Sequence, residues 1–241
     1  MKASTKRWVE VAMGLAILIA GVRFLLVMKN REKPGNTRSA ASQPAPPLNA
    51  NYYVVPKKLY PFDLKSARQL TQQPVWVKEG YRYTYYPYDA ARHHADYKTE
   101  AGTLAPLEKL EIKDVVADAA PSGRLVAAIF ARDGKSYAVQ IGTISGKEYR
   151  IYSDEMFFIQ DPRQLYNFWP GDVWDAIAKH EVRPGMDELQ ADFAVGMGIP
   201  QRQEDAAIKT VDYPNGGKPL QVTFRDGKAV DVKPGPSSAT S

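Results

Sequence analysis

Residues 125–145, LVAAIFARDGKSYAVQIGTIS, carry the pattern that decides the fold of the first half of the chain. Residues 125–131 are apolar on both faces, as in a fully buried strand, and residues 137–141 alternate with period two. Asp133-Gly134 lies between the two runs, and Asp-Gly between apolar segments is the strongest short-range signal for a β-hairpin. The stretch therefore predicts two antiparallel strands joined by a tight turn.

The same kind of pattern extends in both directions along the chain. A Glu79-Gly80 turn precedes the hairpin and a Ser145-Gly146 turn follows it, with Tyr, Val, Ile and Phe on either side. We expect a small antiparallel β-barrel-like or strongly twisted sheet, and we assign residues 51–165 to this β-rich region.

From residue 161 onward the spacing becomes helical. Residues 173–178 place their apolar side chains on one helical face, and Asp187 with Gln190 forms the pattern of a capping box for a second helix. Three strands follow, at residues 208–213, 220–224 and 229–232. Residues 166–233 are thus predicted to form two helices packed on a three-stranded antiparallel meander, which makes the chain α+β.

Turn, capping and core residues of this last quarter resemble a known module. They are Val182, Gly185, Met186, Asp187, Gln190, Gly196, Pro200, Val222, Phe224, Asp226, Gly227, Lys228, Val230 and Val232. Over residues 172–233 they resemble the SmpA/OmlA (BamE-type) outer-membrane assembly lipoproteins, and the layout is similar to that of the β-lactamase inhibitor protein. The resemblance implies a binding module without catalysis. Members of the family attach by a lipidated Cys, which this chain lacks, and the whole layout resembles membrane-anchored envelope proteins of bacteria.

The N-terminus predicts a membrane anchor. Residues 8–28 are almost uninterrupted apolar and, at ~1.5 Å per residue, are long enough to cross a ~30 Å hydrocarbon layer. A cleaved signal peptide is the alternative, but no small-x-small site ends the run. Basic residues flank both ends of the run, so the positive-inside rule does not decide the orientation. Short basic N-termini ahead of a first apolar helix usually stay inside. We expect a single-pass protein of the bacterial inner membrane with its N-terminus inside and its domain in the periplasm.

The amino-acid composition predicts which parts of the chain lie outside the folded domain. Residues 1–7 are a basic N-terminus, residues 29–50 a Pro/Ala/Ser-rich linker and residues 234–241 a disordered tail. Residues 1–50 hold eight of the 32 basic and two of the 27 acidic residues, so the rest of the chain is close to neutral. This argues against nucleic-acid binding, which needs a basic surface on the domain.

The sequence gives no catalytic, cofactor or metal constellation. His93, His94, Asp96 and Glu100 are able to bind a divalent metal in principle, but adjacent histidines point in different directions, so a polar surface loop is the better interpretation. The chain has no Cys, which excludes thiol enzymes. We therefore predict a non-catalytic protein whose ectodomain binds a protein partner or cell-wall glycan, in a scaffold or assembly role. A periplasmic hydrolase with an unrecognised carboxylate site is the alternative.

Two sets of residues are candidates for the binding surface. Alternation along a strand places Tyr81, Tyr83 and Tyr85 on one face, where their rings can stack on a glycan or hold a peptide. The alternative is that this face packs in the protein's own core. Gln221 and Thr223 are predicted on the face of the C-terminal meander opposite Phe224, which we expect to point into the core.

Overall fold

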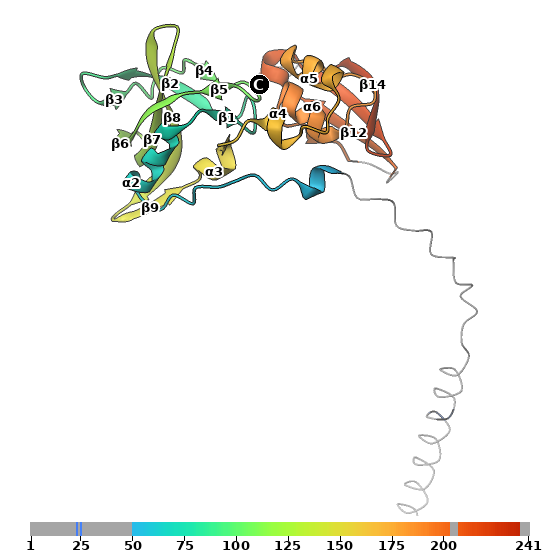
Figure 1. Cartoon of the computed structure of the whole chain (residues 1–241), viewed down its shortest axis with the longest axis horizontal. Coiled ribbons are helices and arrows are strands. Elements are labelled where there is room, and N and C mark those ends of the chain that lie inside the picture. The colour runs from blue at the N-terminus through green and yellow to red at the C-terminus, as the bar shows by residue number, and fades with distance from the viewer. Residues whose placement is uncertain (1–22, 24, 26–49, 203–206, 237–241) are drawn as a thin grey trace, which may run out of the picture. The chain divides into compact units, whose positions relative to one another are not determined.

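The computed structural model describes residues 50–202 and 207–236, together with Arg23 and Leu25 (Figure 1). The described residues from 50 onward belong to one compact unit. The predicted anchor at 8–28, apart from Arg23 and Leu25, the linker up to residue 49 and most of the C-terminal tail lie outside the described residues. In the part that the structure describes, no helix is both long and apolar enough to cross a membrane.

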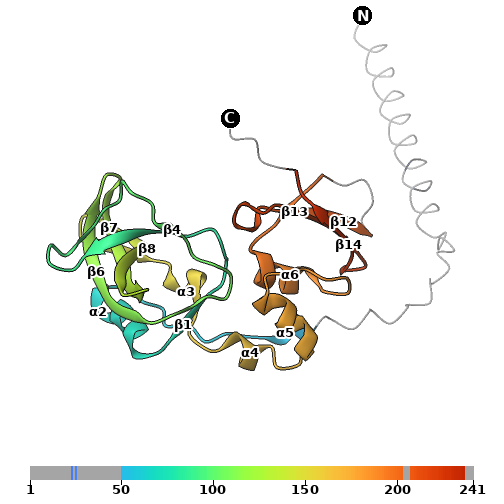
Figure 2. The same cartoon turned by 90° about the horizontal axis from the view of Figure 1, so that it is seen from above.

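The first part of the compact unit is a curled antiparallel sheet (Figure 2). Its strand order is β3-β2-β8-β7-β6, with β4 paired to β2 and β9 to β8, and a smaller sheet has the order β10-β1-β5. The strands are β1 (Val75–Val77), β2 (Thr84–Asp89), β3 (His94–Ala95), β4 (Gly102–Thr103), β5 (Lys109–Leu110), β6 (Ile112–Ala120), β7 (Gly123–Arg132), β8 (Lys135–Ser145), β9 (Glu148–Ile151) and β10 (Phe157–Phe158). The predicted antiparallel α+β class is confirmed, and the sheet curls into half a barrel.

The central hairpin forms as its sequence predicts. Arg132 pairs with Lys135, and Asp133 and Gly134 between them have φ of 50° and 73°, as a two-residue type I′ turn requires. Strand β7 is buried on both faces because alternate side chains enter two different cores. Val126, Ala128 and Phe130 face one core, and Leu125, Ala127 and Ile129 face the other.

Short helical segments cover the curled sheet. They are α2 (Leu64–Ala67), the 3₁₀ turn η2 (Arg68–Gln72) and α3 (Ser153–Met156), whereas the 3₁₀ turn η1 (Ala50–Tyr53) contacts the C-terminal part, where Asn51 accepts from Trp169 Nε1 at 2.8 Å. Helix α2 begins with a capping box, in which the Asp63 carboxylate accepts from the Ser66 N–H at 2.7 Å. Buried Ala67 and Leu70 from this segment join the core under the sheet.

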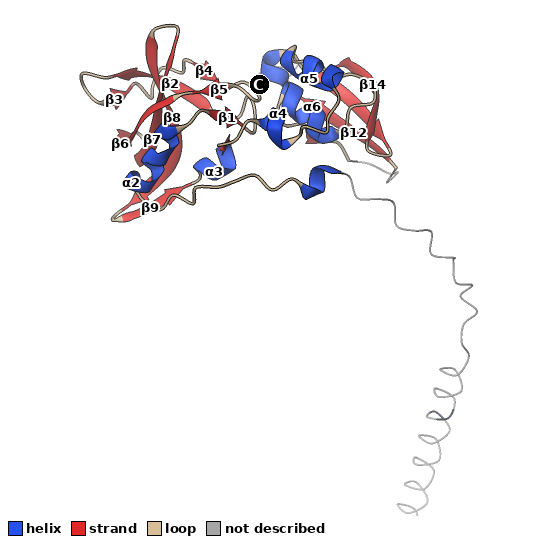
Figure 3. Ribbon diagram, viewed as in Figure 1, coloured by secondary structure: helices blue, strands red, loops and turns tan. Residues whose placement is uncertain are grey.

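The second part places helices on one side of a small sheet (Figure 3). The helices are α4 (Pro162–Leu165), α5 (Gly171–Ala178) and α6 (Glu188–Val195); the strands are β11 (Ile199–Pro200), β12 (Ile208–Tyr213), β13 (Leu220–Arg225) and β14 (Lys228–Pro234), with the 3₁₀ turn η3 (Asn215–Gly217) before β13. The sheet order is β11-β12-β13-β14, all antiparallel, so a fourth short strand extends the meander. Asp187 and Gln190 form the predicted capping box at the start of α6.

A buried carboxylate makes this second part sensitive to pH. Burial, and then the nearby charge of Glu188, raises the pKa of Asp192 in α6 to about 7, while the Tyr213 hydroxyl and Lys209 offset this only in part. Because the pKa is higher in the folded than in the unfolded chain, the contribution to stability is complete below about pH 4 and is lost as pH rises through 7.

We therefore expect the free energy of unfolding to fall by about 2–3 kcal/mol between pH 5 and pH 8 through Asp192. Denaturant melts at a series of pH values measure this slope, and Asp192→Asn should remove most of it. The same slope in the variant would assign the pH dependence to another group.

Candidate functional site

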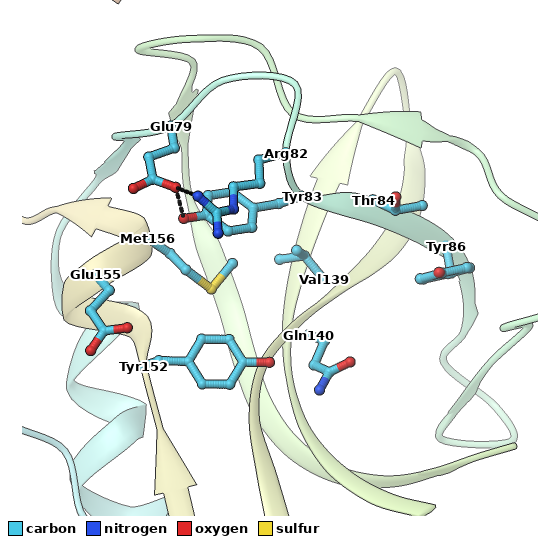
Figure 4. Close-up of a pocket in the computed structure, with 10 residues that line it drawn as sticks. All are labelled: Glu79, Arg82, Tyr83, Thr84, Tyr86, Val139, Gln140, Tyr152, Glu155 and Met156. Carbon is cyan, nitrogen blue, oxygen red and sulfur yellow. Dashed lines mark hydrogen bonds and ion pairs between the residues drawn. The ribbon is translucent and has the colours of Figure 1, made fainter. Parts of the chain in front are cut away.

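An open groove lies between the curled sheet and α3 (Figure 4). Its volume is about 420 Å³, and side chains from the β1–β2 loop, β2, β8 and α3 with its preceding residue meet around it. The lining residues are Glu79, Arg82, Tyr83, Thr84, Tyr86, Val139, Gln140, Tyr152, Glu155 and Met156. We call this the tyrosine groove, because three of its ten lining residues are tyrosines.

One wall of the tyrosine groove is a hydrogen-bonded cluster. The Glu79 carboxylate accepts from Arg82 Nη1 at 2.7 Å and from the Tyr83 hydroxyl at 3.3 Å (Figure 4). Burial, followed by the charge of Glu79, raises the pKa of Tyr83, so its hydroxyl stays a donor at any physiological pH. These contacts hold the Tyr83 ring and Arg82 in place before any ligand arrives.

The opposite wall combines an aromatic ring with an amide. Tyr152 projects its ring into the groove with the hydroxyl toward Gln140 (Figure 4). Burial raises the pKa of the Tyr152 hydroxyl, which therefore remains protonated. Aromatic faces beside hydroxyl, amide and carboxylate groups suit a ligand with both apolar faces and many hydroxyl groups, such as a sugar chain. Both acidic side chains of the groove, Glu79 and Glu155, have access to such a ligand.

The structure separates the three tyrosines that the sequence placed on one strand face. Strand β2 begins only at Thr84, and Tyr81 has a φ of 61°, which breaks the expected alternation. Tyr83 alone of the three lines the tyrosine groove. The Tyr81 ring packs directly against Gly216, where an added Cβ atom would lie 2.7 Å from the ring. This contact joins the β1–β2 loop to the C-terminal part.

Tyr85 is a core residue. Its side chain is 8% exposed and makes an edge contact with Phe130 at 5.6 Å between ring centroids. The Arg132 guanidinium lies 4.4 Å from the centre of the Tyr85 ring, donates to its hydroxyl and pairs with Glu108. The three tyrosines therefore do not share one face: the positive φ of Tyr81 separates it from β2, and Tyr85 packs in the protein's own core, as the alternative interpretation has it.

Gln221 and Thr223 lie on the outer face of the meander, as predicted. They alternate with Val222 and Phe224, which are buried under the helices. Gln221 Nε2 donates to the Asp212 carboxylate at 3.0 Å, and Thr223 pairs across the strands with Thr210 and Asp231. This face is polar and partly exposed.

A second hollow, of about 530 Å³, contains a histidine paired with a buried carboxylate. Asp118 accepts from His94 Nδ1 at 2.7 Å, from the Tyr97 hydroxyl at 2.8 Å and from the N–H groups of Ala95 and Ala119. Burial raises the pKa of Asp118, but these hydrogen bonds outweigh it and leave the pKa below its ordinary value. Asp118 is thus ionised and holds the imidazole in one orientation.

The four residues considered for a metal site do not converge. The His94 ring is hydrogen-bonded to Asp118, whereas the side chains of His93, Asp96 and Glu100 are exposed. Among the residues that the structure describes, no three His, Asp or Glu side chains gather around a position that suits a metal ion.

Sequence reasoning missed the groove residues that come from distant strands. Tyr86 belonged to the tyrosine-rich run. Gln140 reaches the site because β2 pairs with β8, and Tyr152 because the chain after β9 stays hydrogen-bonded to β8 at Ile141. Asp118 lies 24 residues from His94, with no local signal joining them. Comparison of the chain with known protein families, with curated proteins and with solved structures found no match.

Proposed function

We propose that this protein is a non-catalytic, membrane-anchored envelope protein whose folded unit binds cell-wall glycan in the tyrosine groove. The observation that carries the proposal is the convergence of Tyr83, Tyr86 and Tyr152 with Gln140 and Glu79 around one open groove. The predicted apolar run at 8–28 supports the anchor, and the linker that follows would hold the domain away from the bilayer.

The polar groups of the groove favour a glycan over an apolar ligand. The Glu79 cluster presents donors and acceptors that are already oriented by each other, which reduces the ordering cost of binding. Tyr152 supplies a ring that can stack on the apolar face of a sugar, and a stacking ring adds area at small entropic cost.

The test is sedimentation of the full chain in detergent with isolated peptidoglycan. Tyr152→Ala should weaken binding by about tenfold or more, as expected when an interface loses an aromatic anchor. Tyr60→Ala is the matched control, because this tyrosine is 75% exposed and lies outside the groove. Equal binding by the two variants would overturn the assignment of the groove.

The same experiment separates binding from catalysis. Release of soluble sugar that disappears in Glu79→Gln would replace the proposal with a hydrolase that uses the groove carboxylates.

Fusions of alkaline phosphatase and of a fluorescent protein after residue 45 test the orientation of the chain in the membrane. Fluorescence without phosphatase activity would place the domain inside the cell.

A protein partner on the C-terminal meander is the second candidate. Strand β14 is an edge of its sheet, and edges with an exposed polar face are where proteins add strands or dock. The proposed resemblance to BamE-type modules implies such a binding role for this part. Crosslinking from Gln221 or Thr223 in membranes would recover such a partner.

A further inference from the structure

The segment that enters the folded unit exposes four large apolar side chains. Tyr53 ends η1, and residues 54–62 then form a strap without helix or strand that runs to α2, drawn in blue in Figure 1. Tyr53, Val55, Tyr60 and Phe62 are 70%, 83%, 75% and 74% exposed. We call these four side chains the strap face.

The strap is held firmly along its inner side. Val54 packs against the core of the C-terminal part and Leu59 against the core of the curled sheet. The N–H groups of Leu59 and Tyr60 both donate to the Asp154 carboxylate, at 3.0 and 2.7 Å, and the Lys57 N–H donates to Gln160. The apolar side chains therefore point outward from an ordered backbone and do not belong to a loose end.

The charges beside the strap face indicate what kind of surface it binds. Residues 50–62 contain Lys57 and Lys58 and no Asp or Glu, and both lysines are exposed. Aromatic side chains mixed with Lys are typical of segments at a membrane interface, where rings enter the headgroup layer and ammonium groups pair with anionic lipid. A water-exposed role gives no reason for four large, strongly exposed apolar side chains within ten residues.

The position of the strap in the chain brings it close to a bilayer. It closely follows the predicted linker of residues 29–50, which spans roughly 68 Å at ~3.1 Å per residue in an extended polyproline II conformation. A tether of this length keeps the folded unit at a high effective concentration near the lipid surface. A weak interaction with the lipid is therefore enough to keep the strap face bound to it.

We propose that the strap face docks on the anionic lipid surface next to the anchor, and this rests on the proposed membrane anchoring. Tyr60 and Phe62 enter the headgroup layer, while Lys57 and Lys58 contact anionic headgroups. Docking would orient the folded unit on the bilayer.

The absence of cysteine allows a direct test with single labels. Full-length protein carrying Val55→Cys with an environment-sensitive fluorophore is reconstituted into vesicles of phosphatidylcholine and phosphatidylglycerol that contain a spin-labelled quencher lipid. We expect quenching at least threefold stronger than for a label at Lys135→Cys, at the exposed start of β8. Adding Lys57→Glu and Lys58→Glu should abolish most of the difference.

The outcomes separate docking from anchoring. Equal quenching at the two labels in protein that resists carbonate extraction would overturn docking and leave the anchor intact. Release of the chain by carbonate would overturn both. Lipid-independent fluorescence changes that follow self-association would assign the strap face to a second copy of the chain.

Discussion

Replacing Phe224 by Ala is expected to lower the free energy of unfolding by about 3–5 kcal/mol. Phe224 lies in β13, is 2% exposed and shares a core with Phe193 of α6 and Val211 of β12. Removing the ring loses its buried area and leaves a cavity that the paired strands on both sides of β13 prevent from closing.

Denaturant melts measure the effect, and Phe62→Ala is the matched control. The same chemical change at a side chain that is 74% exposed should cost less than about 0.5 kcal/mol. Gln221→Ala, next to Phe224 but on the outer face, loses one hydrogen bond to Asp212 and should cost less than about 1 kcal/mol. Comparable losses in Phe224→Ala and Gln221→Ala would mean that the register of β13 is wrong.

The C-terminal part was predictable because its signals are local. The capping box of Asp187 and Gln190 begins α6, and the Asp226-Gly227 turn, with φ of 51° and 76°, joins β13 to β14. Each signal acts within four residues, so the sequence alone specifies where the element starts or turns. Strand β12 accordingly spans residues 208–213, as the alternation predicts.

The candidate site was not predictable in the same way. The tyrosine groove takes side chains from four separate segments, and its far wall is positioned by the pairing of Tyr85 with Val139 across β2 and β8. The expected alternation failed at Tyr81, because its positive φ is set by contacts with the loop at Leu104 and with Gly216. Such contacts depend on tertiary structure, which overrides local strand preference.

Replacing Asp118 by Ala is expected to cost about 3 kcal/mol of stability. The side chain of Asp118 is 5% exposed, and its oxygens accept from His94, from Tyr97 and from the N–H of Ala95. Its removal leaves the Ala95 N–H and the Tyr97 hydroxyl without their acceptor in a largely buried place, and unsatisfied buried donors are costly. Asp175→Ala, at an exposed site of α5, is the charge-matched control and should stay within about 0.5 kcal/mol.

The pH dependence of this loss identifies its cause. Because hydrogen bonds hold the pKa of Asp118 below its ordinary value despite burial, the carboxylate stabilises the fold above about pH 4, and this contribution is lost as pH falls through the folded pKa. The difference between the wild-type chain and Asp118→Ala should therefore be complete at pH 7 and shrink as pH falls below about 4. A difference that is constant with pH would show that Asp118 acts by filling space, and the hydrogen-bonded pair with His94 would then have no part in stabilising the second hollow.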